Sequence, residues 1–425
     1  MQSKGTTPVA IVGAGPYGLS IAAHLASRAI PFRIFGRPMS AWRDQMPAGM
    51  FLKSDGHASN LSHPDGELTL EDFCRAEGRP YEHFGLPIPL DLFVDYGLAF
   101  QRRFVPRVEE VEVAGVRACD DGFALTLTDG ETVPAAAVVV SAGCDPFRRL
   151  PASLAHLGLD RLSHSADHRD FDAFAGKTVC VVGAGASATD VAAALHAAGA
   201  KAHLVSRADR LEWVLPRTEM PRFESLAKLD VLKGGRYGQG YIYSQLPHLY
   251  RYLPGAARTH IARTYLGPRG GWPVRACVEA LPQHLGASIL RAEDRDGAVD
   301  LHLRLRNGER RVLRADHVIS ATGYRIDIGR MGLLSPELRG RIRTLDGAPE
   351  LSPGFESNIR GLYFAGYAAL HSFGPLMRFV AGSDFAARRV SSAIARSLHA
   401  QRPNAATAQG VPRTTRAFAA APENE

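Results

Sequence analysis

One stretch near the start of the chain, from Pro8 to Arg28, constrains the fold more than any other: PVAIVGAGPYGLSIAAHLASR. A short apolar run leads into the turn GAGPYG, and a helix-forming segment of small residues follows. Strand, glycine turn and helix in this order open a dinucleotide-binding βαβ unit. The turn is expected to bend at Gly13, admit a pyrophosphate at Gly15 and pack its helix closely at Gly18, with Pro16 and Tyr17 beside the cofactor. The pattern therefore predicts a parallel α/β sheet with phosphate at the helix N-terminus.

A second turn of the same kind follows 170 positions later in the chain. The apolar run KTVCVV precedes GAGASA, and a helix and a strand ending at Val205 are predicted after it. Two matches in the same structural context predict two dinucleotide units, the later one with contacts from Gly183, Gly185, Ser187 and Ala188. Ser206 and Arg207 stand after the strand, where an NAD site usually carries an acid. Since a guanidinium pairs well with a 2′-phosphate, these two residues favour NADPH; a solvated arginine is the alternative.

The first unit departs from the usual pattern at the end of its second strand. Gly36 and Arg37 stand there in place of the acid that holds a ribose hydroxyl. Residues 37–107 are long and irregular, as functional segments often are. We expect Arg37 and Trp42 to lie along the cofactor, although a plain surface excursion would explain the segment as well.

Composition narrows the class of protein. The 425 residues are 45% hydrophobic and 22% charged, without a run of about 20 apolar residues or a signal peptide. We therefore expect a cytoplasmic protein without membrane contact. The net charge of +7 is spread over the chain, which favours anionic cofactors over nucleic acid. Five cysteines without C-x-x-C or ligand spacing argue against a local redox dithiol and against a metal site.

In the later part of the chain, further predicted strands end at glycine. The runs ending at Ala321-Thr322-Gly323-Tyr324 and at Gly366 predict buried strands that stop where a ligand comes close. Pro375 is predicted to open a helix whose free N–H groups at Leu376 and Met377 would stabilise charge on a flavin. His371 is a candidate proton donor there, and a structural hydrogen bond explains it equally well. Residues 212–275, rich in tyrosine and tryptophan, are either a cover over a pocket or ordinary packing.

With these residues in place, the chain resembles the class B flavin monooxygenases over residues 8–396. The resemblance implies FAD on Gly13, Gly15 and Gly18, and NADPH on the second turn. Ala321-Thr322-Gly323-Tyr324 resembles the A-T-G-[YF] linker of that group, and Gly366 stands in its late flavin motif. Phe51-Leu52-Lys53 is similar to a segment of ornithine and lysine N-hydroxylases in which the lysine holds the substrate carboxylate. Lys53 would then favour an anionic substrate; an ordinary surface lysine is the alternative.

The expected fold class is α/β, with two Rossmann-like dinucleotide-binding domains. The FAD domain is discontinuous and the NADPH domain is inserted into it. The expected boundaries are 1–165 for the first part of the FAD domain, 166–325 for the NADPH domain with an insertion at 212–275, 326–396 for the second part of the FAD domain, and 397–425 for a disordered tail.

The function implied by the resemblance is that of an NADPH-dependent FAD monooxygenase. Such an enzyme activates O2 as a C4a-(hydro)peroxyflavin and oxygenates a small molecule, here by N-hydroxylation, and the F-L-K segment favours an anionic one. Its partners would be this substrate and O2, and the oligomeric state is left open. Three alternatives remain: an NAD(P)H:acceptor flavin oxidoreductase without oxygen insertion, a urate-hydroxylase-like flavoprotein, and a dinucleotide-binding regulatory protein without activity.

Overall fold

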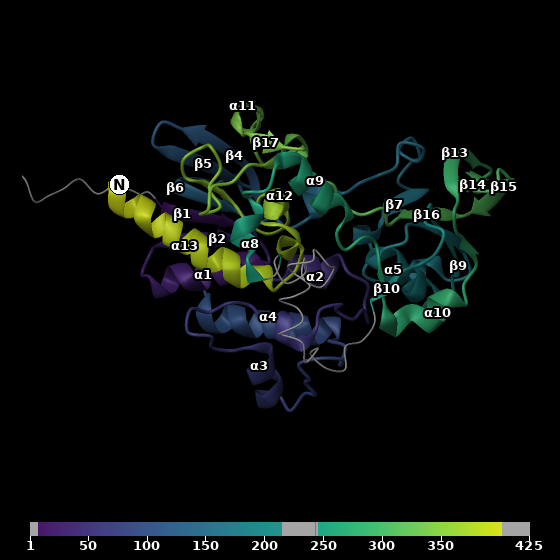
Figure 1. The fold of residues 1–425 in the computed structure, drawn as a ribbon, viewed down its shortest axis with the longest axis horizontal. Helices are drawn as coiled ribbons and strands as arrows, with labels where there is room; N and C mark the ends of the chain where they lie inside the picture. Colours follow the sequence, from purple (N-terminus) through teal and green to yellow (C-terminus); the bar gives the residue numbers. More distant parts are fainter. Residues whose placement is uncertain (1–6, 215–242, 244, 402–425) are drawn as a thin grey trace, which may run out of the picture.

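The chain forms two α/β units side by side, as Figure 1 shows for a computed structural model that describes residues 7–214, 243 and 245–401. The first unit contains the chain start and the late residues, and the second is built from the middle of the chain. The expected fold of two Rossmann-like units, one inserted into the other, is confirmed.

The sheet of the first unit is parallel around the first glycine turn. β1 runs at its centre, between β2 and β6, and β19 runs parallel to the end of β6. The early half of β6 continues into an antiparallel hairpin arm instead. The strands are β1 (Thr7–Val12), β2 (Phe32–Phe35), β3 (Val108–Glu109), β4 (Val113–Cys119), β5 (Gly122–Leu127), β6 (Thr132–Val140) and β19 (Leu362–Phe364).

Helices from both ends of the chain cover this sheet. α1 (Pro16–Ser27) packs along α13 (Gly382–Gln401), so the first and last described helices lie side by side. Their apolar faces belong to one core with the sheet. The remaining helices of the first unit are α2 (Ser40–Asp44), α3 (Leu70–Ala76), α4 (Leu90–Phe104), α11 (Pro336–Arg341) and α12 (Leu370–Phe373), and the short strands β17 (Thr344–Leu345) and β18 (Ala348–Pro349) form a hairpin.

The second unit has a five-stranded sheet in which every pairing is parallel. α5 (Ala186–Ala197) and α10 (Arg275–Glu279) pack together on it. The strands are β7 (Leu162–His164), β8 (Thr178–Val182), β9 (Lys201–Val205), β12 (Gln283–His284) and β16 (His317–Ser320). An antiparallel sheet of β13 (Ser288–Arg295), β14 (Ala298–Arg304) and β15 (Arg310–Ala315) forms the outer end of the unit.

Two of the places where the described chain crosses between the units lie next to each other. Arg148 and Tyr324 form a bridge, and the Arg149 N–H donates to the Gly323 carbonyl at 3.0 Å. Leu154 and Leu157 already pack in the second core, before β7 joins the second sheet. The first crossing therefore precedes Leu154 and does not fall at residue 165, because apolar packing of the 154–164 segment assigns it to the second unit.

The described part of the 212–275 insertion is divided between the two units: its helices pack against the first, and its two ends pack against the second. α8 (Pro247–Tyr250) and α9 (Gly255–Thr264) both contact α12, and Tyr250 is 1% exposed. β10 (Trp213–Val214) and β11 (Gly270–Gly271) pair with each other. Packing therefore explains Tyr250, whereas Tyr237 and Tyr241 lie outside the described residues.

Two expectations about the C-terminal region are wrong: that the last helix opens at Pro375, and that a disordered tail begins at residue 397. The last helix begins at Gly382, and Pro375–Arg378 forms a separate 3₁₀ turn, η8. Phe379 is extended between the two, and a side chain at Gly382 would collide with the Tyr17 hydroxyl. α13 also continues to Gln401, past the predicted tail start at 397; the rest of that tail, 402–425, lies outside the described residues.

The remaining short segments are 3₁₀ turns: η1 (Gly56–Ala58), η2 (Asp145–Phe147), η3 (Ser165–Asp167), η4 (Asp172–Phe174), η5 (Trp272–Val274), η6 (Ile328–Arg330) and η7 (Gly366–Ala369). Among the described residues, no helix has the length and apolar character that crossing a bilayer requires.

Candidate functional site

A large cavity runs between the two units and reaches both glycine turns. Its volume is about 1100 Å³, and its walls include the ends of β1 and β8 and the starts of α1 and α5. In open α/β sheets, ligands bind at the carboxyl ends of the strands. We refer to this space as the central cavity. The predicted contact residues that line it are Gly13, Gly15, Pro16, Tyr17, Trp42, Gly183, Gly185, Ser187, Ser206, Arg207, Thr322, Gly323 and Gly366.

The first glycine turn has the geometry of a phosphate cradle. Gly13 has φ +106°, and a Cβ there would lie 2.5 Å from the Ser141 carbonyl oxygen. A Cβ on Gly15 would meet no described atom within 4 Å, so this face of the turn opens into the central cavity. α1 begins at Pro16 without a side-chain cap and without an acidic residue in its first turn. Its N-terminal N–H groups are therefore available to an anion, which fits a cofactor pyrophosphate.

The second glycine turn repeats the bend of the first but is less open, because a Cβ on Gly185 would lie 3.3 Å from the Pro268 Cβ. Gly183 has φ +154°, and a side chain there would collide with the Ala321 carbonyl oxygen. α5 begins after Gly185, again without a side-chain cap or an acidic residue in its first turn. Ser187 lines the cavity at this helix start. The uncapped helix start therefore fits a second pyrophosphate, which would lie beside Pro268.

The end of β9 adds positive charge to the cavity wall. Ser206 is buried, and its hydroxyl accepts the Ala208 N–H at 3.0 Å. Arg207 is exposed in the cavity wall, and within the described ranges its guanidinium has no ion-pair partner. The nearby Arg210 is different, because it pairs with Glu212 at 2.7 Å. An unpaired guanidinium at this place suits a 2′-phosphate.

Several lining residues were not predicted from the sequence. Arg149 and Cys144 lie where the chain crosses between the units, and Phe379 lines the cavity beside Tyr17, whose hydroxyl donates to the Phe379 carbonyl at 2.8 Å. Burial raises the pKa of the Cys144 thiol to about 11, so this cysteine is protonated at neutral pH. Cys144 and Arg149 follow the end of β6, so the strand-end rule could have found them.

Some predicted contacts lie outside the lining. Arg37 pairs with Asp44 at 2.5 Å. Gly18 and Ala188 are buried under the turns, and a side chain at Gly18 would collide with the Gly13 carbonyl oxygen. Both therefore support the turns through packing.

Pro375 and Leu376, both predicted to contact the cofactor, are also absent from the lining. η8 has only four residues, and the Met377 N–H already donates to the Gly374 carbonyl at 3.1 Å. The prediction of two free donors at Leu376 and Met377 is therefore wrong for Met377, because the chain turns at Gly374 into a 3₁₀ turn and not into a long helix.

His371 lies in α12 and lines neither cavity described here. It is 6% exposed, and neither ring nitrogen has a hydrogen-bond partner among the described residues. Burial lowers its pKa, and the nearby Asp346, 3.7 Å away, opposes this shift. The structure thus places a neutral imidazole in the packing around α12.

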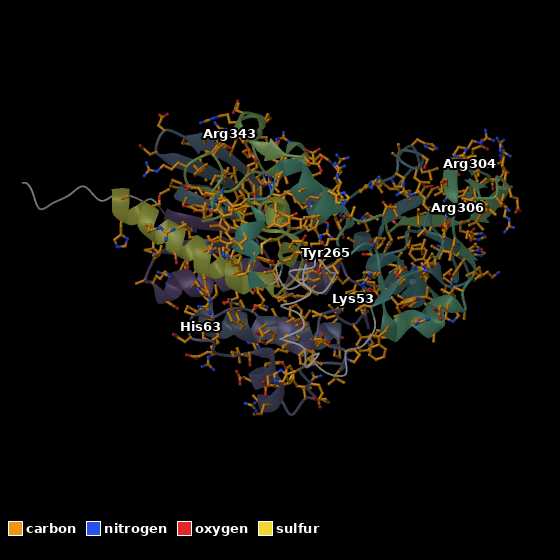
Figure 2. All side chains as sticks on the ribbon, viewed as in Figure 1. Lys53, His63, Tyr265, Arg304, Arg306 and Arg343 are labelled. Atoms are coloured by element: carbon orange, nitrogen blue, oxygen red, sulfur yellow. The ribbon has the colours of Figure 1, made fainter. Side chains whose placement is uncertain are left out.

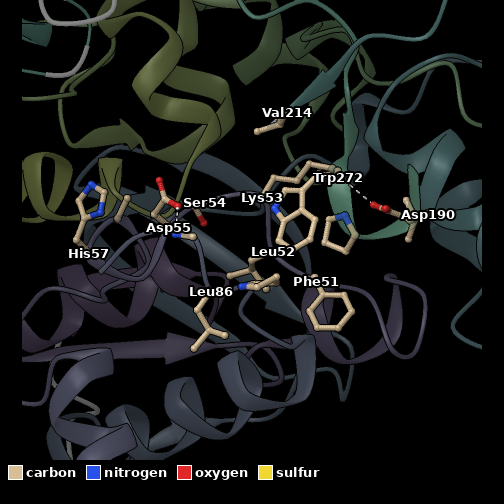
Figure 3. A pocket seen from close by; sticks show the side chains of 16 residues that line it. Phe51, Leu52, Lys53, Ser54, Asp55, His57, Leu86, Asp190, Val214 and Trp272 are labelled. Atoms are coloured by element: carbon tan, nitrogen blue, oxygen red, sulfur yellow. Dashed lines mark hydrogen bonds and ion pairs between the residues drawn. The ribbon is translucent and has the colours of Figure 1, made fainter. Parts of the chain in front are cut away.

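Lys53 lies in a second, smaller cavity of about 210 Å³, which we call the interdomain pocket. One wall comes from the Phe51–Ala58 segment of the first unit, and the other from α5 and the Gly271–Val274 segment. Figure 3 shows Lys53 reaching toward Asp190 of α5, and the two charged atoms are 2.7 Å apart. Lys53 is thus paired across the two units. Asp190 was not predicted from the sequence.

Other basic residues lie away from these cavities. Figure 2 shows Arg304 and Arg306 at the outer end of the second unit, far from Lys53 in the middle of the molecule. Many exposed arginines are paired with carboxylates, such as Arg306 with Asp209. The positive charge is dispersed here, as the sequence predicted.

The fold and the paired glycine turns define a two-dinucleotide-binding flavoprotein. A family model for pyridine nucleotide-disulphide oxidoreductases matches residues 7–226, which is more than half of the chain. The chain belongs to this family.

Solved structures with the same fold span 92% of the chain at low sequence identity. The ornithine N-hydroxylase of Kutzneria sp. 744, with reduced FAD, NADP+ and L-ornithine, has a TM-score of 0.74, 18% identity and 100% of its own chain covered. The L-lysine 6-monooxygenase of Pseudomonas syringae has a TM-score of 0.68, 17% identity and 100% covered. The bacillithiol disulfide reductase of Staphylococcus aureus has a TM-score of 0.62, 16% identity and 99% covered. These likenesses concern the fold, which oxygenases and reductases share.

A curated relative shows closer sequence similarity, over about half of its length. The indole-3-pyruvate monooxygenase YUCCA1 of Oryza sativa subsp. japonica is 33% identical over 220 residues, which is 49% of this chain and 49% of the relative.

Proposed function

We propose that the chain is an NADPH-dependent FAD monooxygenase that oxygenates a small molecule. The observation that carries the proposal is the central cavity, because both uncapped helix starts line one continuous space with Arg207, which is unpaired within the described part of the chain. A flavin and a nicotinamide held by the two turns would share this space. The monooxygenases among the similar proteins support the same class.

The chain's own residues would hold the two cofactors in distinct ways. Gly15 and the start of α1 would hold the FAD pyrophosphate, and Gly185, Ser187 and the start of α5 would hold that of NADPH. Arg207 would pair with the 2′-phosphate. When bound, FAD supplies hydride acceptance and oxygen activation, and the protein supplies position and an apolar wall that includes Met377 and Phe379.

The state of Cys144 favours an oxygenase over a disulfide reductase. A thiolate is the reactive form of cysteine, and a pKa of about 11 leaves little of it at neutral pH. The five cysteines are all free in the described part of the chain. Thiol exchange in the central cavity is therefore disfavoured. We propose that the substrate binds in the interdomain pocket, because Lys53 of the F-L-K segment lines it.

The test is the fate of oxygen in the FAD-loaded protein. We expect NADPH to reduce the bound flavin, and stopped-flow mixing with O2 to give an absorbing flavin–oxygen adduct before reoxidation. Consumption of NADPH with stoichiometric H2O2 and no adduct would support the plain oxidoreductase instead. A protein that takes up no FAD would support the non-enzymatic alternative.

A further inference from the structure

The charges in the interdomain pocket differ from those of a carboxylate-binding site. Lys53 Nζ donates to Asp190 Oδ2 at 2.7 Å, and the side chains are 23% and 7% exposed. Lys53 Cε passes close to Gly271, where a Cβ would lie 3.3 Å from it, so the glycine leaves room for this pairing. The ammonium charge is therefore neutralised within the protein.

A ligand carboxylate would have to compete with a partner that cannot easily leave. Asp190 is held on α5 and buried, and its desolvation raises its pKa while Lys53 opposes this shift. Displacement of Asp190 would leave a buried carboxylate without a counter-charge, which is strongly unfavourable. An anionic ligand thus gains one ion pair at the expense of another.

The other charged and polar side chains of the pocket also disfavour an anionic ligand. Figure 3 shows Asp55 and His57 on the side of the pocket opposite Asp190. Asp55 accepts the Gly85 N–H at 3.4 Å, and His57 bonds through its ring to the His83 carbonyl at 3.1 Å. Counted over the described lining residues, the pocket holds one lysine and two carboxylates. This balance repels a net anion.

The pocket still offers hydrogen-bond donors. An ammonium group has three N–H donors, and the described residues accept one hydrogen bond from Lys53. The rest of the wall is largely apolar and partly aromatic, with Phe51, Leu52, Leu86 and Trp272 around the lysine. Drug-sized ligands occupy cavities of about 300 Å³ or more, so a space of 210 Å³ suits a molecule of about one ring.

We propose that the interdomain pocket binds an uncharged, flat ligand group with a hydrogen-bond acceptor such as an amide or ring carbonyl, and that Asp190 sets this preference by neutralising Lys53. The inference rests on the proposed function only in treating this pocket as the substrate pocket. It replaces the anionic substrate that the F-L-K segment implied, and it makes Asp190 a specificity-determining residue on the helix that starts at the second nucleotide turn.

The test uses two probes of the same shape, benzamide and benzoate, with binding to the FAD-loaded protein followed by ligand-observed NMR. We expect wild type to bind benzamide about tenfold more tightly than benzoate or better. Asp190→Asn should reverse this order, because it exposes the lysine charge to the ligand. Asp300→Asn is the matched control, since Asp300 is also buried and paired, with Arg314 at 3.2 Å, but lies in β14 outside the pocket. This control should keep the wild-type preference.

A second variant guards against a folding defect in Asp190→Asn. The double variant Lys53→Met/Asp190→Asn removes both charges, so no buried charge is left unpaired. It should bind benzamide more weakly than wild type and should not gain benzoate binding. Three results would overturn the proposal. Wild type could prefer benzoate, a folded Asp190→Asn could keep the wild-type preference, or wild type could fail to bind benzamide at about 10 mM. Flavin reduction by NADPH, measured in the same samples, reports separately on the proposed function.

Discussion

The two glycine turns share one local geometry but sit in very different surroundings. Around the first, α1 is covered by α13, which comes from the far end of the chain. His24 of α1 contacts Ser62 at 2.9 Å, and Ser62 donates to Asp384 of α13 at 2.7 Å. Around the second, α5 meets the other unit through Asp190, and Arg207, which has no ion-pair partner among the described residues, follows β9. The helix of the first turn is enclosed by distant parts of the chain, which we propose suits a resident cofactor, whereas the second turn offers charge to a ligand that exchanges.

The largest effect should come from adding a side chain beneath the first turn. Gly18→Ala places a Cβ against the Gly13 carbonyl oxygen, and backbone cannot yield as a side chain can. We expect the free energy of unfolding to fall by about 3 kcal/mol, measured by urea denaturation. Gly15→Ala is the matched control, because its Cβ would meet no described atom within 4 Å. It should keep stability within about 0.5 kcal/mol and lose FAD instead. Equal destabilisation by both variants would contradict this division of roles.

The buried network of the first unit should make the protein sensitive to acid. His24 is 2% exposed; burial, reinforced by Arg388 and opposed by Asp384, lowers its pKa to about 4. Because the unfolded histidine binds its proton near pH 6.5, stability from neutral His24 is present above that pH and is lost as pH falls toward 4. The loss should be about 3 kcal/mol at most, measured by unfolding at a series of pH values.

The second unit offers the control for that measurement. His196 occupies the last turn of α5, as His24 does in α1, but it is exposed. His24→Gln should flatten the dependence of stability on pH between 6.5 and 4, whereas His196→Gln should leave the slope as in wild type. If His196→Gln flattened the slope as much as His24→Gln, the acid sensitivity would not come from the first network.

Features set by neighbouring residues were predictable from the sequence, and features set by docking of distant segments were not. Gly13 and Gly183 could be found because a positive φ next to a strand end is a local requirement. Asp190 could not, since its face of α5 points toward Lys53 only once the two units are packed together. The same limit explains the last helix: its start at Gly382 depends on contact with Tyr17, more than 360 positions away. The anionic preference attributed to Lys53 rested on its segment alone and omitted this partner.

The smallest of these effects, and the one that separates the two turns most directly, concerns the arginines after β9. Arg207 lines the central cavity without an ion-pair partner among the described residues, and Arg210 is 83% exposed and paired with Glu212. A charge-assisted hydrogen bond contributes about 1.5 to 3 kcal/mol. Arg207→Gln should therefore raise the KM for NADPH by about tenfold to a hundredfold. NADH lacks the 2′-phosphate, so its KM should stay the same. Arg210→Gln should change neither value, because an exposed ion pair contributes little. A parallel rise in the KM for NADH would mean that Arg207 supports the shape of the turn. An effect from Arg210→Gln alone would mean that Arg210, and not Arg207, contacts the 2′-phosphate. The first result would remove the difference in charge on which the contrast between a resident and an exchanging nucleotide depends, and the second would keep that difference but assign it to Arg210.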